Sequence, residues 1–125
     1  MTDADNRELI IRYMALDVDL LYGLIPIELE EYTDTRFSPE GQADAGRRFF
    51  VRITRQLQDA LCPKWAEWRV NPEMQDSVNL VAAIADIISS LFVGVPPFVV
   101  ASIIVKLGLG RFCSNVANQD NDSTS

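Results

Sequence analysis

The stretch that decides the fold is residues 38–61, SPEGQADAGRRFFVRITRQLQDAL. Ser38 can cap a helix, Pro39 suits the first helical position because its missing N–H would be unbonded there, and Glu40 complements the positive first turn. The apolar residues that follow recur at helical spacing and share one face. They are Ala43, Phe49, Phe50, Ile53, Leu57, Ala60 and Leu61. We therefore predict an amphipathic helix over 39–61.

The opposite face of this helix is basic. It carries Arg47, Arg48, Arg52 and Arg55, extended beyond the helix by Lys64 and Arg69. These arginines can pair with the acidic N-terminal third of the chain, since residues 1–46 hold eleven acidic and three basic side chains. They can instead bind an acidic protein partner or phosphate. Nucleic acid is the least favoured partner, because the chain is acidic overall, with a net charge of −7, and no aromatic residues interleave with the arginines on the same helix face.

The N-terminal third predicts a helix over 6–22 that is apolar on two sides, interrupted afterwards by Gly23 and Pro26. One stripe contains Leu9, Tyr13, Leu16 and Leu20, and the second contains Ile10, Ile11, Met14, Val18 and Leu21. A helix with two apolar sides must pack against other residues on both of them. We expect the first helix to lie centrally in its own bundle, or its second stripe, through Ile10, Met14 and Leu21, to bind a protein partner or a second copy.

Further helices are predicted over 26–32, 72–93 and 97–107. Residues 72–93 follow a second cap–proline–acid start, Asn71-Pro72-Glu73. Pro63, directly after Cys62, is expected to stop the helix of 39–61. Trp65 and Trp68 would then lie in the connection to the next helix and fill space in the core. The fold class is all-α, a compact bundle of four to five helices in one domain over 1–114, followed by a polar, disordered tail over 115–125.

The apolar block over 78–107 raises the possibility of a membrane segment. Its first half places Asn79, Asp86 and Ser90 on one face, and an aspartate near the centre of a spanning helix is costly. Its second half is apolar all round but too short to span. We therefore expect a buried core, with a membrane-active hairpin over 78–107 as the alternative.

The chain has no histidine, which removes the commonest general base and the commonest metal ligand. Cys62 and Cys113 lack CxxC spacing and are expected as buried reduced thiols, with a disulfide as the alternative. The acidic groups Asp17 with Asp19, and Glu28, Glu30 and Glu31, have no base or nucleophile nearby in sequence and are expected at the surface, with a carboxylate-only divalent-metal site as the remaining possibility. No catalytic residue, cofactor or metal site is predicted.

The expected function is therefore non-enzymatic. We expect an interaction or adaptor protein, or a small helical subunit of a larger assembly, which docks through the arginine face and the doubly apolar first helix. The polar, acidic N-terminus has none of the features of a secretory signal, so a cytoplasmic location is the expectation.

Overall fold

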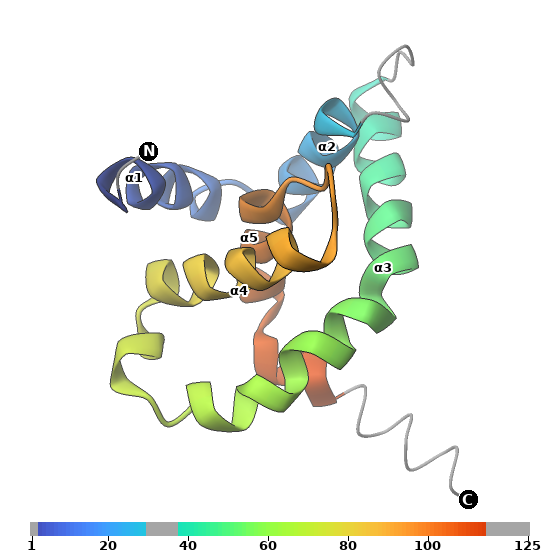
Figure 1. Cartoon of the computed structure of the whole chain (residues 1–125). Helices are drawn as coiled ribbons and strands as arrows, with labels where there is room; N and C mark the ends of the chain where they lie inside the picture. The colour runs from blue at the N-terminus through green and yellow to red at the C-terminus, as the bar shows by residue number, and fades with distance from the viewer. Residues whose placement is uncertain (1–2, 30–37, 115–125) are drawn as a thin grey trace, which may run out of the picture.

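The computed structural model describes residues 3–29 and 38–114, and every regular element within these ranges is helical (Figure 1). The elements are α1 (Asp3–Met14), α2 (Val18–Glu28), α3 (Pro39–Trp68), the 3-10 helix η2 (Pro72–Gln75), α4 (Ser77–Leu91) and α5 (Pro97–Leu107). Helical residues 109–114 follow α5. The predicted all-α bundle is confirmed. Residues 115–125, predicted as a disordered tail, lie outside the described ranges.

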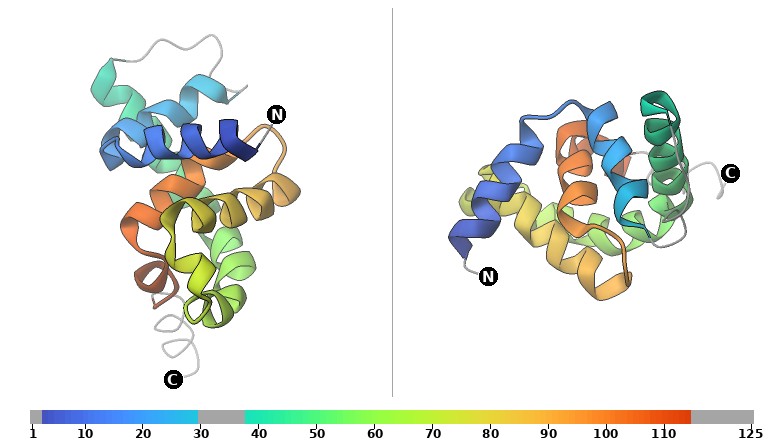
Figure 2. Two further views of the ribbon diagram at one scale, coloured as in Figure 1. Left: turned by 90° about the vertical axis from the view of Figure 1, so that its left-hand side faces the viewer. Right: turned by 90° about the horizontal axis from the view of Figure 1, so that it is seen from above.

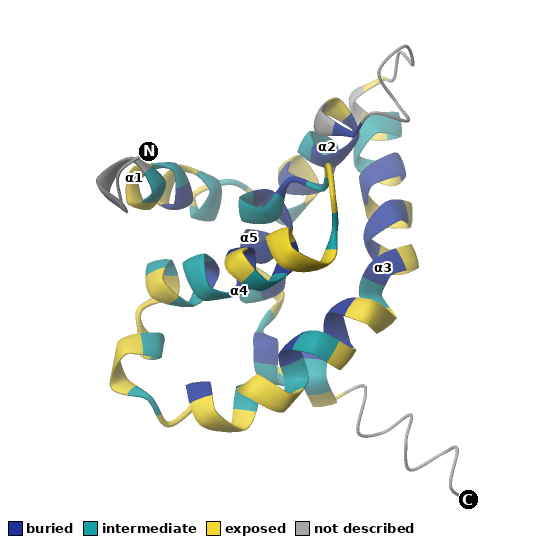
Figure 3. Ribbon diagram, viewed as in Figure 1, coloured by how far each residue is buried: buried dark blue, intermediate teal, exposed yellow. Residues whose placement is uncertain are grey.

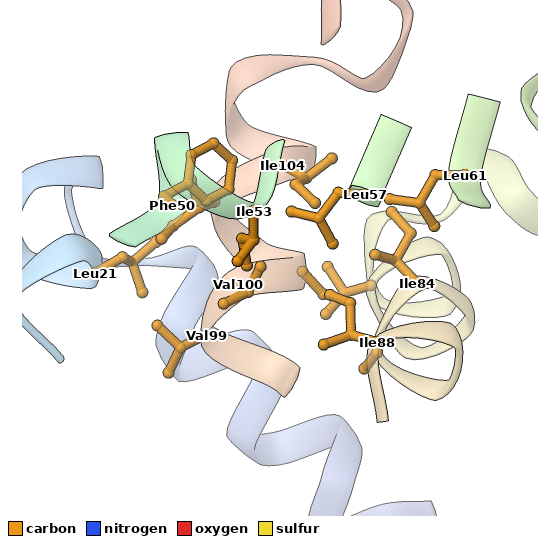
Figure 4. Packing of buried hydrophobic residues seen from close by; sticks show 14 of the residues in the cluster. Leu21, Phe50, Ile53, Leu57, Leu61, Ile84, Ile88, Val99, Val100 and Ile104 are labelled. Carbon is orange, nitrogen blue, oxygen red and sulfur yellow. The ribbon is translucent and has the colours of Figure 1, made fainter. Parts of the chain in front are cut away.

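Helix α5 occupies the centre of the bundle, with the other helices around it (Figure 2). Its bounds match the predicted 97–107, and residues 99–104 are all buried, as a segment that is apolar on every side requires. In the core, Val100 and Ile104 of α5 lie beside residues of α3, and Val99 lies on the side of Leu21 of α2 (Figure 4). The helix ends at Gly108, whose positive φ of 95° suits a residue without a side chain.

The predicted single helix over 6–22 is wrong. The chain turns at residues 15–17, and α2 then begins after Asp17 and continues through both Gly23 and Pro26 to Glu28. Pro26 has no N–H to donate to the Tyr22 carbonyl one turn earlier, and at that carbonyl α2 lies against Gly46 of α3. The proline therefore removes a hydrogen bond at a place where tertiary packing holds the helix. The helix predicted over 26–32 is also wrong at its start, and residues 30–32 lie outside the described ranges.

Helix α3 does not stop at Cys62-Pro63 but runs on to Trp68, so the two tryptophans belong to its last turns. Pro63 withholds a hydrogen bond only from the carbonyl of Asp59, an exposed residue where water can replace the missing donor. Beyond α3, the helix predicted over 72–93 is divided into η2 and α4. Asp76 makes the division, because its side chain accepts a hydrogen bond from the Val78 N–H at 2.8 Å and so caps α4.

Cys62 and Cys113 are joined by a disulfide, with their Cα atoms 5.4 Å apart, which corrects the expectation of reduced thiols. The bridge is one of several contacts between residues 109–114 and α3, and the rings of Phe50 and Phe112, 6.2 Å apart, make another. Gln58 Nε2 donates a hydrogen bond to the Phe112 carbonyl at 3.1 Å, and the Trp65 ring lies so close to Gly110 that an added Cβ would come within 3.2 Å of it. Residues 58, 62 and 65 follow the i, i+4, i+7 spacing of a single helix face.

Helices α4 and α5 contribute their apolar sides to the core, as expected for residues 78–107. Val81, Ile84, Ala85 and Ile88 of α4 are buried, whereas Asn79, Asp86 and Ser90 are exposed. Among the helices that the structure describes, none has both the length and the apolar character needed to cross a membrane.

Candidate docking surface on α3

The first half of α3 has one buried and one exposed face (Figure 3). Phe49, Phe50, Ile53 and Leu57 are buried in the core. Arg48, Arg52 and Arg55 are exposed and follow the i, i+4, i+7 spacing of the opposite face. Val51 lies among them with 66% of its surface exposed. We call these four residues, Arg48, Val51, Arg52 and Arg55, the α3 docking surface.

Arg47 does not belong to this surface, because it is held against α2. Its guanidinium donates hydrogen bonds to Asp19 Oδ1 at 2.9 Å and to Asp44 Oδ1 at 3.0 Å, and lies 5.2 Å from the centre of the Tyr22 ring. Pairing with the acidic N-terminal third, one of the three roles considered for the arginines, is thus found for Arg47. The pairs are exposed to solvent, so they orient the arginine more than they stabilise the fold.

The other three arginines differ from Arg47 in their contacts. Arg55 Nε lies 3.6 Å from Asp59 Oδ1, one turn along the same helix, and both side chains are about two-thirds exposed. The Arg52 guanidinium lies 5.2 Å from the centre of the Phe49 ring, which holds its stem against α3. Arg48 forms no ion pair with any residue in the described part of the chain. The α3 docking surface thus presents three arginines on a protein whose net charge is −7.

Tyr22, beneath Arg47, has an altered acidity. Burial raises the pKa of its phenol above the ordinary value of 10.0, Arg47 opposes this rise, and the negative charge of Asp19 adds to it. The folded state thus holds the phenolic proton more tightly than the unfolded chain does.

We expect the stability that comes from Tyr22 to be complete below about pH 10 and to be lost as the pH rises through the folded-state pKa. Absorbance titration of the parent minus that of Tyr22→Phe isolates this phenol from the other tyrosines. Arg47→Gln should raise the Tyr22 pKa further, because it removes the positive charge that lowers this pKa. A Tyr22 pKa at or below that of an unfolded chain would show that burial does not dominate.

The docking role expected for the first helix loses its structural basis. Ile10 and Leu21 are buried in the core, and Met14 is half-buried against it, so these three residues do not form an exposed stripe. Their burial follows from the break at residues 15–17, which lets α1 and α2 each turn part of an apolar side toward the core. The large exposed apolar residues of this region are instead Ile11, Leu20 and Ile27.

Within the described ranges, the acidic residues form no group of three potential ligands that could hold a metal ion. Asp17 occupies the position before α2, and Asp19 pairs with Arg47. Glu30 and Glu31, and the side chain of Glu28, lie outside the described residues.

Val51 is the member of the surface that sequence reasoning missed. Its place on a helical wheel, between Arg47 and Arg55, was readable from the spacing alone.

Comparison of the chain with protein-family models, curated proteins and solved structures finds no match in any of the three.

Proposed function

We propose that the chain is a non-enzymatic binding protein that docks the α3 docking surface onto an acidic surface of a protein partner, as an adaptor or as a subunit of a larger assembly. The observation that carries this proposal is the exposure of Arg48, Arg52 and Arg55 around Val51 on one helix face. Arginine side chains bind carboxylates through two parallel hydrogen bonds, and an apolar residue among them supplies area that excludes water.

The α3 docking surface belongs to a helix that is held against the core, which favours this role. Buried residues on the opposite side of the same turns, from Phe49 to Leu57, fix the direction of α3, and the Arg52 guanidinium already lies against Phe49. Side chains held by a rigid element lose less conformational entropy on binding. The surface is thus suited to recognition without rearrangement of the helix.

The charge of the surface also limits the partner. Two copies related by two-fold symmetry through this face would bring arginines against arginines, which is unfavourable. The acidic partner is therefore a different protein, or a different, acidic surface of a second copy. Duplex DNA and other phosphates remain weaker candidates, because the net charge of −7 opposes their approach.

The Cys62–Cys113 disulfide bears on where docking takes place. Disulfides persist in oxidising compartments and are rare in the cytosol. We therefore propose that the docking takes place in an oxidising compartment, and not in the cytoplasm that was expected from the sequence.

The test is a double charge reversal, Arg48→Glu with Arg52→Glu, compared with a control of equal charge change elsewhere, Arg12→Glu with Arg111→Glu. All four arginines are exposed, so both proteins should keep the parent's helical circular dichroism. Fluorescence anisotropy with labelled polyglutamate at low salt measures binding to an acidic polypeptide. We expect the α3 pair to weaken binding by at least about tenfold and the control pair to weaken it much less.

Equal losses in the two variants would show that overall charge, and not the α3 docking surface, attracts the acidic chain. Retained binding by the α3 variant would contradict the proposal outright. Labelled duplex DNA is titrated in parallel, and tighter binding to DNA than to polyglutamate would replace the acidic protein partner with a phosphate ligand.

A further inference from the structure

The α3 docking surface is bounded by an aspartate at each end. Asp44 lies four residues before Arg48 on α3. Asp59 lies four residues after Arg55, so both aspartates fall on the same helix face as the arginines, one turn beyond them. Both are exposed. Along this face the charge is therefore negative at one end, positive around Val51, and negative again at the other end.

A partner that covers the α3 docking surface also covers both aspartates. At 1.5 Å per residue, Asp44 and Asp59 lie at most about 22 Å apart along the helix. A standard protein interface buries about 800 Å² on each partner, which corresponds to a patch about 30 Å across. The two aspartates therefore fall within a standard interface centred on Val51.

The two aspartates already contact arginines of their own chain, but they stay accessible to a partner. Arg47 donates a hydrogen bond to Asp44 Oδ1 at 3.0 Å, and Arg55 Nε lies 3.6 Å from Asp59 Oδ1. Both aspartate side chains are more than half exposed, and a carboxylate can accept about four hydrogen bonds. Exposed ion pairs of this kind contribute little, so they can be exchanged for contacts with a partner at low cost.

This order of charges discriminates between acidic partners. A segment that is acidic along its whole length would place carboxylates against Asp44 and Asp59, and like charges across an interface are unfavourable. A segment with a basic residue at each end would pair with both aspartates instead. Duplex DNA is uniformly negative and meets the same repulsion. The aspartates thus act against the wrong partner, which is a common source of specificity.

We propose that the partner segment is acidic only in its centre, where carboxylates surround an apolar residue, and carries lysine or arginine at both ends. This inference rests on the proposed function, because it describes the partner of the same surface. The partner is a different protein, since no helix in the described ranges carries three carboxylates at the i, i+4, i+7 spacing of the arginines.

The experiment titrates the ¹⁵N-labelled whole chain with three synthetic peptides that share one centre, in which glutamates surround a leucine. Each peptide carries two lysines, two glutamines or two glutamates at both of its ends. NMR spectra give the affinity and locate the site through the backbone amides of Val51 and Arg52. An ionic strength of about 0.1 M, with a Debye length of about 10 Å, screens the distant charges of the protein more than the contacts at the surface.

We expect the lysine-ended peptide to bind at least about threefold more tightly than the glutamine-ended peptide, because its ends pair with Asp44 and Asp59. The glutamate-ended peptide should bind more weakly than either, although it has the largest negative charge. Simple attraction between an acidic chain and the arginines predicts the opposite order.

A pair of charge reversals, Asp44→Lys with Asp59→Lys, tests the cause of this order. The variant should invert it, so that the glutamate-ended peptide binds most tightly. Glu8→Lys with Asp86→Lys is the matched control, because it makes the same change in net charge at exposed acids of α1 and α4. The control should keep the order of the parent. All four acids are exposed, so both variants should keep the parent's helical circular dichroism.

Tightest binding of the glutamate-ended peptide to the parent would overturn this inference and leave an acidic partner in place. An unchanged order in the variant of Asp44 and Asp59 would overturn it as well, since the order would then come from other charges. Failure of all three peptides to bind would also overturn it, and polyglutamate, titrated in parallel, then decides whether the proposed function falls with it. Self-association of the parent that the same variant abolishes would contradict the assignment to a different protein.

Discussion

Loss of the Cys62–Cys113 disulfide is expected to lower the free energy of unfolding by about 4 kcal/mol, because the bridge joins residues 51 positions apart and removes much of the freedom of the unfolded chain. A loss of this size is a large part of the stability of a small domain. The variant Cys62→Ser with Cys113→Ser, and the parent in reductant, should therefore both unfold at much lower urea concentration. Circular dichroism against urea measures the two midpoints.

The double variant is also the control for the reductant, since reductant should not change its unfolding midpoint. A thiol count on the native parent, expected to be near zero, shows that the bridge is formed before reduction. Free thiols in the native parent, or equal midpoints with and without reductant, would contradict the pairing.

The reduced chain should keep residues 109–114 partly in place. The hydrogen bond from Gln58 to the Phe112 carbonyl and the contact of Trp65 with Gly110 do not depend on the bridge. We therefore expect a destabilised native fold in reductant and not an altered one.

The helical class and the position of α5 could be predicted, because both follow from local hydrophobic periodicity and from proline and glycine at the ends of the segment. The turn at residues 15–17 could not, because neither glycine nor proline marks it. Gly23, Pro26 and Pro63 led to the opposite error, because they predict helix ends that the structure does not have. Each is a local breaker that lies within a helix, and the packing that holds those helices comes from distant parts of the chain.

The side of α3 that carries the arginines could be predicted from the sequence, but the contacts of the individual arginines could not. Helical spacing placed the arginines opposite the core face of α3, where the structure has them. That Arg47 turns toward Asp19 depends on how α2 lies against α3, which no local pattern records. The disulfide was missed for a similar reason, although the i, i+4, i+7 spacing of Gln58, Cys62 and Trp65 marks the face that the C-terminal segment covers.

Replacing Gly46 with alanine is expected to destabilise the fold by about 2–3 kcal/mol, although alanine is the better helix former. A Cβ at this position would overlap the backbone carbonyl of Tyr22, and neither backbone can move aside without separating α2 from α3. α2 packs more extensively on α3 than on any other helix. Urea unfolding of Gly46→Ala should therefore show a clear decrease in the free energy of unfolding.

Gly23→Ala is the matched control, because it adds the same methyl group to the other side of the same helix pair. Its Cβ would lie 3.7 Å from the Cβ of Gln42, an ordinary contact, so alanine should leave stability unchanged or raise it by up to about 1 kcal/mol. A lower free energy of unfolding in Gly46→Ala, together with an unchanged or higher one in Gly23→Ala, would show that the close approach at Gly46 sets the position of α2. If Gly46→Ala were as stable as the parent, the two backbones would have to lie further apart than in this structure.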